Sequence, residues 1–109
     1  MTDIEAITKK LTDFRNERDW QQFHNPKDLA AALSIEASEL QECFLWKDAQ
    51  EGNIERIKEE LADVFAYAFL MAGHYGFDVR EIVEAKIVKN GEKYPVEKAK
   101  GTALKYWEL

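Results

Sequence analysis

The chain has 109 residues, of which 46% are hydrophobic, and its 21 acidic and 15 basic side chains leave a net charge of −6. This length suffices for a single domain, residues 1–109, with one core, and the hydrophobic content excludes a chain that is disordered by composition. The acidic balance argues against a surface for nucleic-acid polymers, because binding phosphates by charge needs a basic face.

Helix signals follow one another along the chain from its first residues. Thr2 and Glu5 form a capping box, which predicts a first helix that ends near residue 19. A loop from residue 19 to residue 25 follows. Asn25 is a good N-cap and Pro26 suits the first helical position, so we expect a second helix that runs to about residue 44 or 45.

The second half of the chain shows the same kind of signals. Asn53 can cap a third helix that runs to about residue 74 or 75, where Gly76 is suited to end it. Asp78 with Glu81 marks the start of a fourth helix, which we expect to end at residues 90–91. The tail from Pro95 to residue 109 is expected to form one short turn and then extended chain.

These elements predict an all-α protein, a four-helix bundle of antiparallel helices with a short C-terminal tail, because the loops are short enough to make consecutive helices neighbours. The third helix is apolar nearly all round, whereas a monomer of this size should leave that helix a polar side. We therefore expect a homo-oligomer, with a symmetric dimer as its simplest form.

Other features bear on where the protein resides. The first ten residues are charged from Asp3 onward and lack the apolar segment of a signal peptide, and the run 61–73 is too short to cross a bilayer. Cys43 is the only cysteine, so no intrachain disulfide forms. We expect a soluble cytoplasmic protein with no membrane partner.

Two pairs of carboxylates occupy positions where a helix of a globular protein would place apolar residues. Glu36 lies within the apolar stripe of the second helix, and Glu39 lies one turn along at its edge. The third helix repeats this arrangement with Glu60 in its stripe and Asp63 at the edge. Glu42 and Glu59, in contrast, point away from these stripes and are expected in solvent.

Four converging carboxylates would be costly to bury without a compensating cation. Carboxylate oxygens without thiolate or imidazole favour Mg²⁺, with Mn²⁺ as a substitute, or Ca²⁺, over Zn²⁺ and copper. A di-iron bundle is less suitable, because it uses Glu-x-x-His pairs and neither His24 nor His74 follows a glutamate by three residues. We interpret His24 as a loop or capping residue and His74 as structural.

At these residues the chain resembles the MazG-like, all-α nucleoside triphosphate pyrophosphohydrolases, whose pattern is E-x-x-E followed by E-x-x-D. The stretches that carry the resemblance are EASE (36–39), EELAD (59–63), ERDWQQFHNPKDLAAAL (17–33), ECFLWK (42–47) and KNGEKYP (89–95). The last three are similar to the dCTP pyrophosphatase branch, and the resemblance covers roughly residues 4 to 109.

The resemblance implies a house-cleaning hydrolase that converts a dNTP, dCTP-like or dATP, into dNMP and pyrophosphate. It implies a tetramer built as a pair of dimers. It also assigns roles: metal ligands at Glu36, Glu39, Glu60 and Asp63; base contacts at Trp20 and Trp46; a tyrosine of the substrate site at Tyr67; and phosphate and sugar contacts at Lys86, Asn90 and Lys93. We favour Glu36 or Glu39 as the catalytic carboxylate that orients the attacking water or takes its proton.

Two departures from the family pattern stand in the chain. A histidine that touches the base in some members corresponds to Leu11, which puts strict selectivity for cytosine in doubt. Ile35 replaces the first of two adjacent glutamates that many members carry.

Two alternative functions remain open. One is a non-catalytic helical interaction module whose buried acids are structural. The other is a phosphoribosyl-nucleotide pyrophosphohydrolase of histidine biosynthesis, although the paired tryptophans favour a free nucleoside triphosphate.

Overall fold

The computed structural model describes all 109 residues and divides them into two compact units, residues 1–76 and 77–109. Its elements are helices and short 3-10 turns, with no strand, which confirms the all-α prediction. The first unit contains α1 (Asp3–Glu17), η1 (Gln21–Phe23), α2 (Pro26–Glu42), η2 (Ala49–Glu51) and α3 (Ile54–Tyr75). The second unit contains α4 (Val79–Lys93), α5 (Val96–Ala99) and η3 (Tyr106–Glu108).

The helices begin where the capping residues predict. The Thr2 hydroxyl accepts a hydrogen bond from the Glu5 amide, and the Glu5 carboxylate accepts one from the Thr2 amide, which completes the capping box. Side chains cap the other long helices in the same way, namely Asn25 for α2, Asn53 for α3 and Asp78 for α4. At the end of α3, Gly76 adopts a left-handed conformation with φ of 71°, as predicted for its stop.

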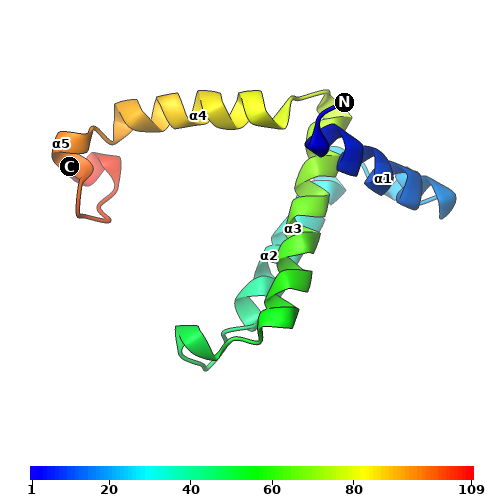
Figure 1. The fold of residues 1–109 in the computed structure, drawn as a ribbon, viewed down its shortest axis with the longest axis horizontal. Coiled ribbons are helices and arrows are strands. Elements are labelled where there is room, and N and C mark those ends of the chain that lie inside the picture. The colour runs from blue at the N-terminus through cyan, green and yellow to red at the C-terminus, as the bar shows by residue number, and fades with distance from the viewer. The chain divides into compact units, whose positions relative to one another are not determined.

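The helices α2 and α3 form the centre of the first unit and lie side by side (Figure 1). A short connection joins them, so they run antiparallel, as expected. The most buried apolar side chains come from these two helices and their junction: Leu29, Cys43, Leu70 and Ala72. Gly52 lets the connection approach closely, because a Cβ there would lie 2.7 Å from the Phe44 ring and 2.9 Å from the Ile57 side chain.

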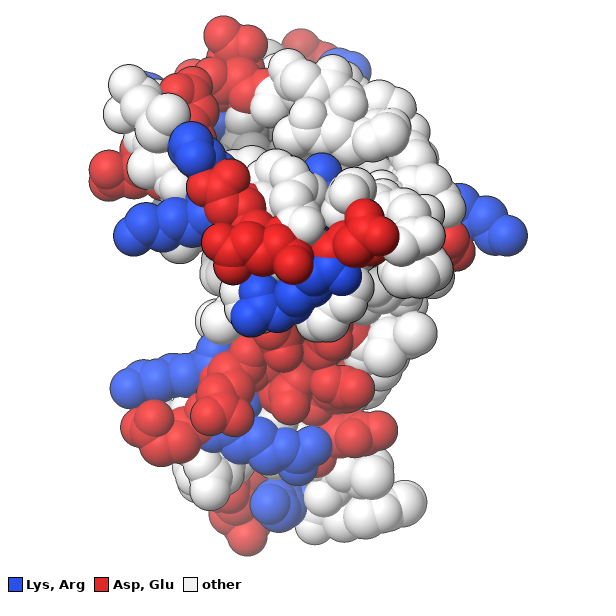
Figure 2. All heavy atoms as spheres, turned by 90° about the vertical axis from the view of Figure 1, so that its right-hand side faces the viewer, with Lys and Arg blue, Asp and Glu red and all other residues white.

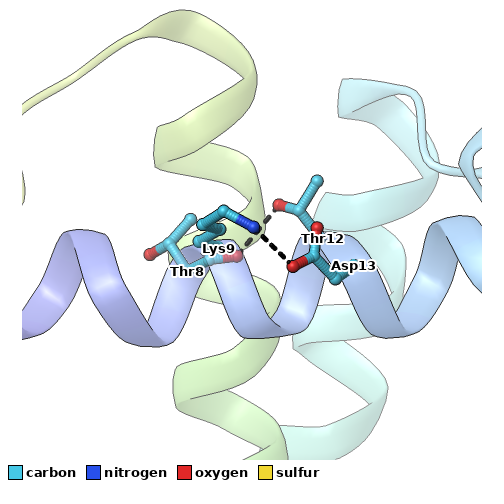
Figure 3. A network of polar contacts seen from close by, with 4 residues as sticks. All are labelled: Thr8, Lys9, Thr12 and Asp13. Carbon is cyan, nitrogen blue, oxygen red and sulfur yellow. Dashed lines mark hydrogen bonds and ion pairs between the residues drawn. The ribbon is translucent and has the colours of Figure 1, made fainter.

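The helix α1 packs against α3 (Figure 1). The two helices approach closely at Gly73, where a Cβ would lie 3.3 Å from the Thr8 methyl group. On α1 itself, Thr12 donates its hydroxyl proton to the Thr8 carbonyl oxygen at 2.9 Å, and Lys9 pairs with Asp13 at 2.7 Å (Figure 3). The ion pair is exposed and therefore contributes little to stability.

Two predictions about element ends were wrong. The helix α4 continues to Lys93, through Gly91, because one glycine in a helix interior costs only about 1 kcal/mol and does not end the helix. In the tail, the predicted short turn forms as α5 and residues 102–105 have no regular structure, but residues 106–108 form the 3-10 turn η3 and not extended chain. The four-helix bundle and the single domain remain predictions.

Candidate active site

Three carboxylates from two helices converge in the first unit. Oxygen atoms of Glu36 on α2 and of Glu60 and Asp63 on α3 all lie within 4.8 Å of one another. Helical spacing explains the arrangement, because residues three apart share a face and α2 faces α3. Such a group of oxygen ligands could bind a metal ion.

Burial makes this cluster unusual. Glu36 and Glu60 are partly buried, and one carboxylate oxygen of each, Oε2, is shielded from solvent without a hydrogen-bond partner. A buried oxygen without a partner costs about 1–3 kcal/mol, and more when it is charged. A cation bound at this cluster could compensate both of these oxygens.

Glu39 is not among the three carboxylates whose oxygen atoms lie within 4.8 Å of one another, but its side chain interacts with both Glu36 and Glu60. Burial, followed by the hydrogen bond and charge of Glu39 and then by the charges of Asp63 and Glu60, raises the pKa of Glu36 to about 7. Burial followed by the same Glu39 contacts also raises the pKa of Glu60. Each group is thus held above its ordinary pKa by desolvation and by like charge.

Apo-protein stability should depend on pH through Glu36. Its pKa rises from 4.5 to about 7 on folding, so the folded state prefers the protonated form and loses stability as pH rises through this window. Between pH 5 and pH 8 with EDTA present, we expect the free energy of unfolding in urea to fall by about 1–2 kcal/mol, with allowance for solvent screening. Glu36→Gln should remove most of this fall, and an equal fall in both proteins would contradict the assignment.

Tyr67 borders the cluster one turn beyond Asp63 on α3. Burial raises the pKa of its hydroxyl, and the charges of Glu36, Asp63 and Glu39 raise it further. The Tyr67 ring meets the His24 ring edge to face, with centroids 6.2 Å apart. The sequence did not predict this contact of His24 with Tyr67, because it joins residues 43 positions apart.

Trp20 is half-exposed beside α1. Its ring meets Phe14 edge to face at 5.9 Å, and the Arg18 guanidinium lies 3.7 Å from the Phe14 centroid. The preceding residue, Asp19, has φ of 58°, a left-handed conformation that is uncommon for a residue with a side chain. Gln21 and Gln22 donate side-chain hydrogen bonds to Asp19 at 2.9 and 3.0 Å, which helps to hold this turn.

Trp46 lies in the connection after α2, and it is 95% exposed. Its own φ is 61°, again left-handed. Such a conformation costs about 1–3 kcal/mol and occurs often at ligand sites, where the strain serves function. Trp46 is therefore not part of the core of this chain.

Lys86, Asn90 and Lys93 belong to the second unit. Lys86 and Asn90 lie on one open face of α4, together with apolar residues that include Ile82 and Ile87. Lys93 Nζ lies 5.0 Å from the ring centroid of Tyr106 in a cation–π contact.

Arg56 is a second residue near the carboxylates that the sequence did not indicate. It lies one turn before Glu60 on α3 and pairs with Glu42 at 3.7 Å. Its positive charge lowers the pKa of Glu60 and so counteracts part of the increase caused by burial and by Glu39. Its spacing of four residues from Glu60 places both side chains on one face of the helix, and this spacing could have predicted their proximity from the sequence.

On the face drawn in Figure 2, acidic side chains gather with lysine and arginine side chains interleaved among them.

None of the helices is long and apolar enough to cross a membrane.

The chain is 38% identical to dCTP pyrophosphatase 1 of Rattus norvegicus and 36% identical to that of Homo sapiens, in each case over 97% of this chain and 67% of the relative. A crystal structure of a pyrophosphatase from Archaeoglobus fulgidus superposes with a TM-score of 0.77 at 33% identity, over 87% of this chain and 94% of that chain.

The family model described as MazG-like matches residues 31–109. That segment contains the three clustered carboxylates, Glu39 beside them, and both α3 and α4. The match covers most of the chain and agrees with the named relatives and with the solved structure. The chain belongs to the MazG-like family.

Proposed function

We propose that the chain is a Mg²⁺-dependent nucleoside triphosphate pyrophosphohydrolase that converts a dNTP into dNMP and pyrophosphate. The observation that carries this proposal is the carboxylate cluster, in which Glu36 and Glu60 each bury an unpartnered oxygen. The relatives are named pyrophosphatases, and they support a hydrolase of the nucleoside triphosphate pyrophosphatase class. A dCTP-like substrate or dATP is the expected choice.

The residues present fit a magnesium ion. All four acidic side chains offer oxygen, which Mg²⁺ prefers, and no cysteine or histidine is part of the close cluster. Glu36, Glu39, Glu60 and Asp63 would hold it, and Mn²⁺ is the expected substitute. When bound, Mg²⁺ supplies positive charge that neutralises phosphate oxygens and lowers the pKa of a nearby water.

The side chains divide the remaining work. Glu36 or Glu39 would orient the attacking water and accept its proton, which is the usual role of a carboxylate within hydrogen-bond reach of a reacting water. Trp20 and Trp46 would stack on the base, and Tyr67 would border the sugar and phosphates. Basic and amide groups on α4 would bind phosphate or sugar through charge and hydrogen bonds: Lys86, Asn90 and Lys93.

An assay with a nucleotide panel tests the activity. Purified protein with Mg²⁺ should release dNMP and pyrophosphate from at least one of dCTP, dATP, dUTP and 5-modified dCTP. Orthophosphate as the first product would contradict cleavage between the α- and β-phosphates. If no nucleotide is turned over and Glu60→Gln leaves metal binding unchanged, a helical interaction module would be the better account.

We propose further that the chain forms a homo-oligomer, a tetramer built from two dimers. Large apolar side chains remain uncovered on α3, where Phe65 is 51% and Leu61 is 41% exposed, and on α4, where Ile87 is 64% exposed. Exposed apolar surface of this extent is typical of association sites. A symmetric assembly of identical chains would cover it.

Placing a charge on this surface should break the assembly. Phe65→Glu should lower the molar mass measured by light scattering to a smaller species, because a carboxylate would be desolvated at the contact. The matched control is Lys58→Glu on the same helix, where the side chain is exposed and polar. A monomeric wild type at micromolar concentration would refute the oligomer.

The expected role is to clean the deoxynucleotide pool of the cytoplasm. Hydrolysis to dNMP removes a nucleotide from the set that a polymerase can use. A preference for 5-modified dCTP over dCTP in the panel would support this role.

A further inference from the structure

A polar atom without a partner lies on His24, whose ring contacts Tyr67. The Nδ1 atom of His24 is shielded from solvent and has no hydrogen-bond partner. Buried polar atoms in native proteins are nearly always satisfied, and leaving one unsatisfied costs about 1–3 kcal/mol. Nothing in the protein compensates this atom, so a bound molecule is the natural source of its partner.

The position of His24 connects it to the site. Its ring meets Tyr67 edge to face, and the hydroxyl of Tyr67 is influenced by the charges of Glu36 and Asp63. Because α2 and α3 are antiparallel, the start of α2 at Asn25 lies toward the C-terminal half of α3, where Tyr67 is found. The order along the unit is therefore carboxylates, Tyr67 and then His24, with Trp20 four residues earlier in the chain.

The charge state of His24 indicates which part of a nucleotide it would meet. Burial lowers the pKa of its imidazole, and the nearby positive charge of Arg15 lowers it further, so the ring is neutral at pH 7. Arg15 itself is only partly exposed and forms no ion pair with a carboxylate. A neutral imidazole attracts phosphate weakly, whereas it can donate or accept a hydrogen bond with a base or a sugar.

We propose that His24 recognises the nucleoside half of the substrate, with its Nδ1 atom forming a hydrogen bond to a polar group of the base or the sugar. This inference rests on the proposed nucleotide hydrolysis and adds a selectivity residue to it. The carboxylates would bind the phosphates, and His24 would distinguish a nucleotide from a bare polyphosphate.

Substitutions that replace one ring nitrogen of His24 but not the other test the inference. The side-chain amide of asparagine can place a polar atom near the position of Nδ1, that of glutamine places one near Nε2, and phenylalanine keeps only the shape of the ring. We expect His24→Phe and His24→Gln to raise KM for the best dNTP about tenfold, the effect of one hydrogen bond, with kcat within about twofold. His24→Asn should keep a KM close to that of the wild type.

Two comparisons show whether the effect belongs to the nucleoside. Inhibition by inorganic tripolyphosphate with Mg²⁺ should be the same in the wild type and in His24→Phe, because that ligand has no nucleoside. If His24 binds the base, the tenfold increase in KM of His24→Phe should persist with a 2′,3′-dideoxynucleotide as substrate. If His24 binds the 3′-hydroxyl, wild type and variant should have equal KM values for that substrate. His74→Phe, which alters an exposed histidine outside the cluster, is the matched control.

Several results would overturn the inference. One is an unchanged KM in a folded His24→Phe variant. Another is a tenfold weaker inhibition of this variant by tripolyphosphate, equal to its tenfold increase in KM for the dNTP. If His24→Phe fails to fold, equal KM values in His24→Asn and His24→Gln would overturn it as well. A wild type that forms no dNMP from any nucleotide would instead refute the proposed function, so the two failures are distinguishable.

Discussion

Glu60→Gln should lower kcat/KM for dNTP hydrolysis at least about 100-fold. Losing a residue that only supports a metal ligand typically costs 10- to 100-fold, and Glu60 is placed to bind the metal itself. The substitution keeps the shape of the side chain and removes its negative charge. Steady-state kinetics with saturating Mg²⁺ measure the loss, and titration calorimetry should show weaker Mg²⁺ binding.

The same substitution should stabilise the protein when no metal is present. Burial and the neighbouring Glu39 raise the pKa of Glu60, so its charge is unfavourable in the folded apo state. We therefore expect a higher Tm for Glu60→Gln than for the wild type in EDTA at pH 8. Glu59→Gln is the matched control, since Glu59 is exposed and adjacent, and it should change neither activity nor Tm. Equal activity in the two variants would refute a role for Glu60 in the site.

Removing divalent metal should abolish turnover. With EDTA in excess we expect activity of about 1% or less of the Mg²⁺ value, because the acidic site would repel a triphosphate that lacks a neutralising cation. Adding back Mg²⁺ or Mn²⁺ should restore it. Metal at 100 times its Kd should also raise the free energy of unfolding by about 2.7 kcal/mol.

Glu60→Gln again provides the control for metal binding. Its Tm should respond much less to added Mg²⁺ than that of the wild type, whereas Glu59→Gln should respond fully. Full turnover after exhaustive chelation would contradict metal dependence, and an equal Tm response in both variants would show that the metal binds elsewhere.

Local signals predicted much of the fold. Helix starts at Thr2, Asn25, Asn53 and Asp78 were confirmed, because each capping side chain satisfies amides within its own first turn. The end of α4 was not predicted, since the continuation through Gly91 depends on small differences in helix propensity. The 3-10 turn η1 was missed for a similar reason, because it lies in a segment without strong periodicity.

The candidate site also contains residues that the sequence could predict and residues that it could not. Helical periodicity placed Glu36 and Glu60 toward the neighbouring helix, and both are partly buried with one shielded oxygen. His24 could not be placed, because its contact with Tyr67 depends on how the start of α2 meets α3. The left-handed backbone conformation of Trp46 could not be predicted either, because that position is occupied by neither glycine nor asparagine, the residues that usually adopt it.

Hydrolysis in oxygen-18-labelled water tests the central claim most directly, namely that this carboxylate site directs water to the α-phosphorus of a nucleoside triphosphate. After a single turnover with Mg²⁺ and the best dNTP, mass spectrometry of both products locates the label. The account predicts one labelled oxygen in dNMP and none in pyrophosphate. Label in pyrophosphate would show attack at the β-phosphorus, and label in orthophosphate would show attack at the γ-phosphorus, and either result would contradict the account.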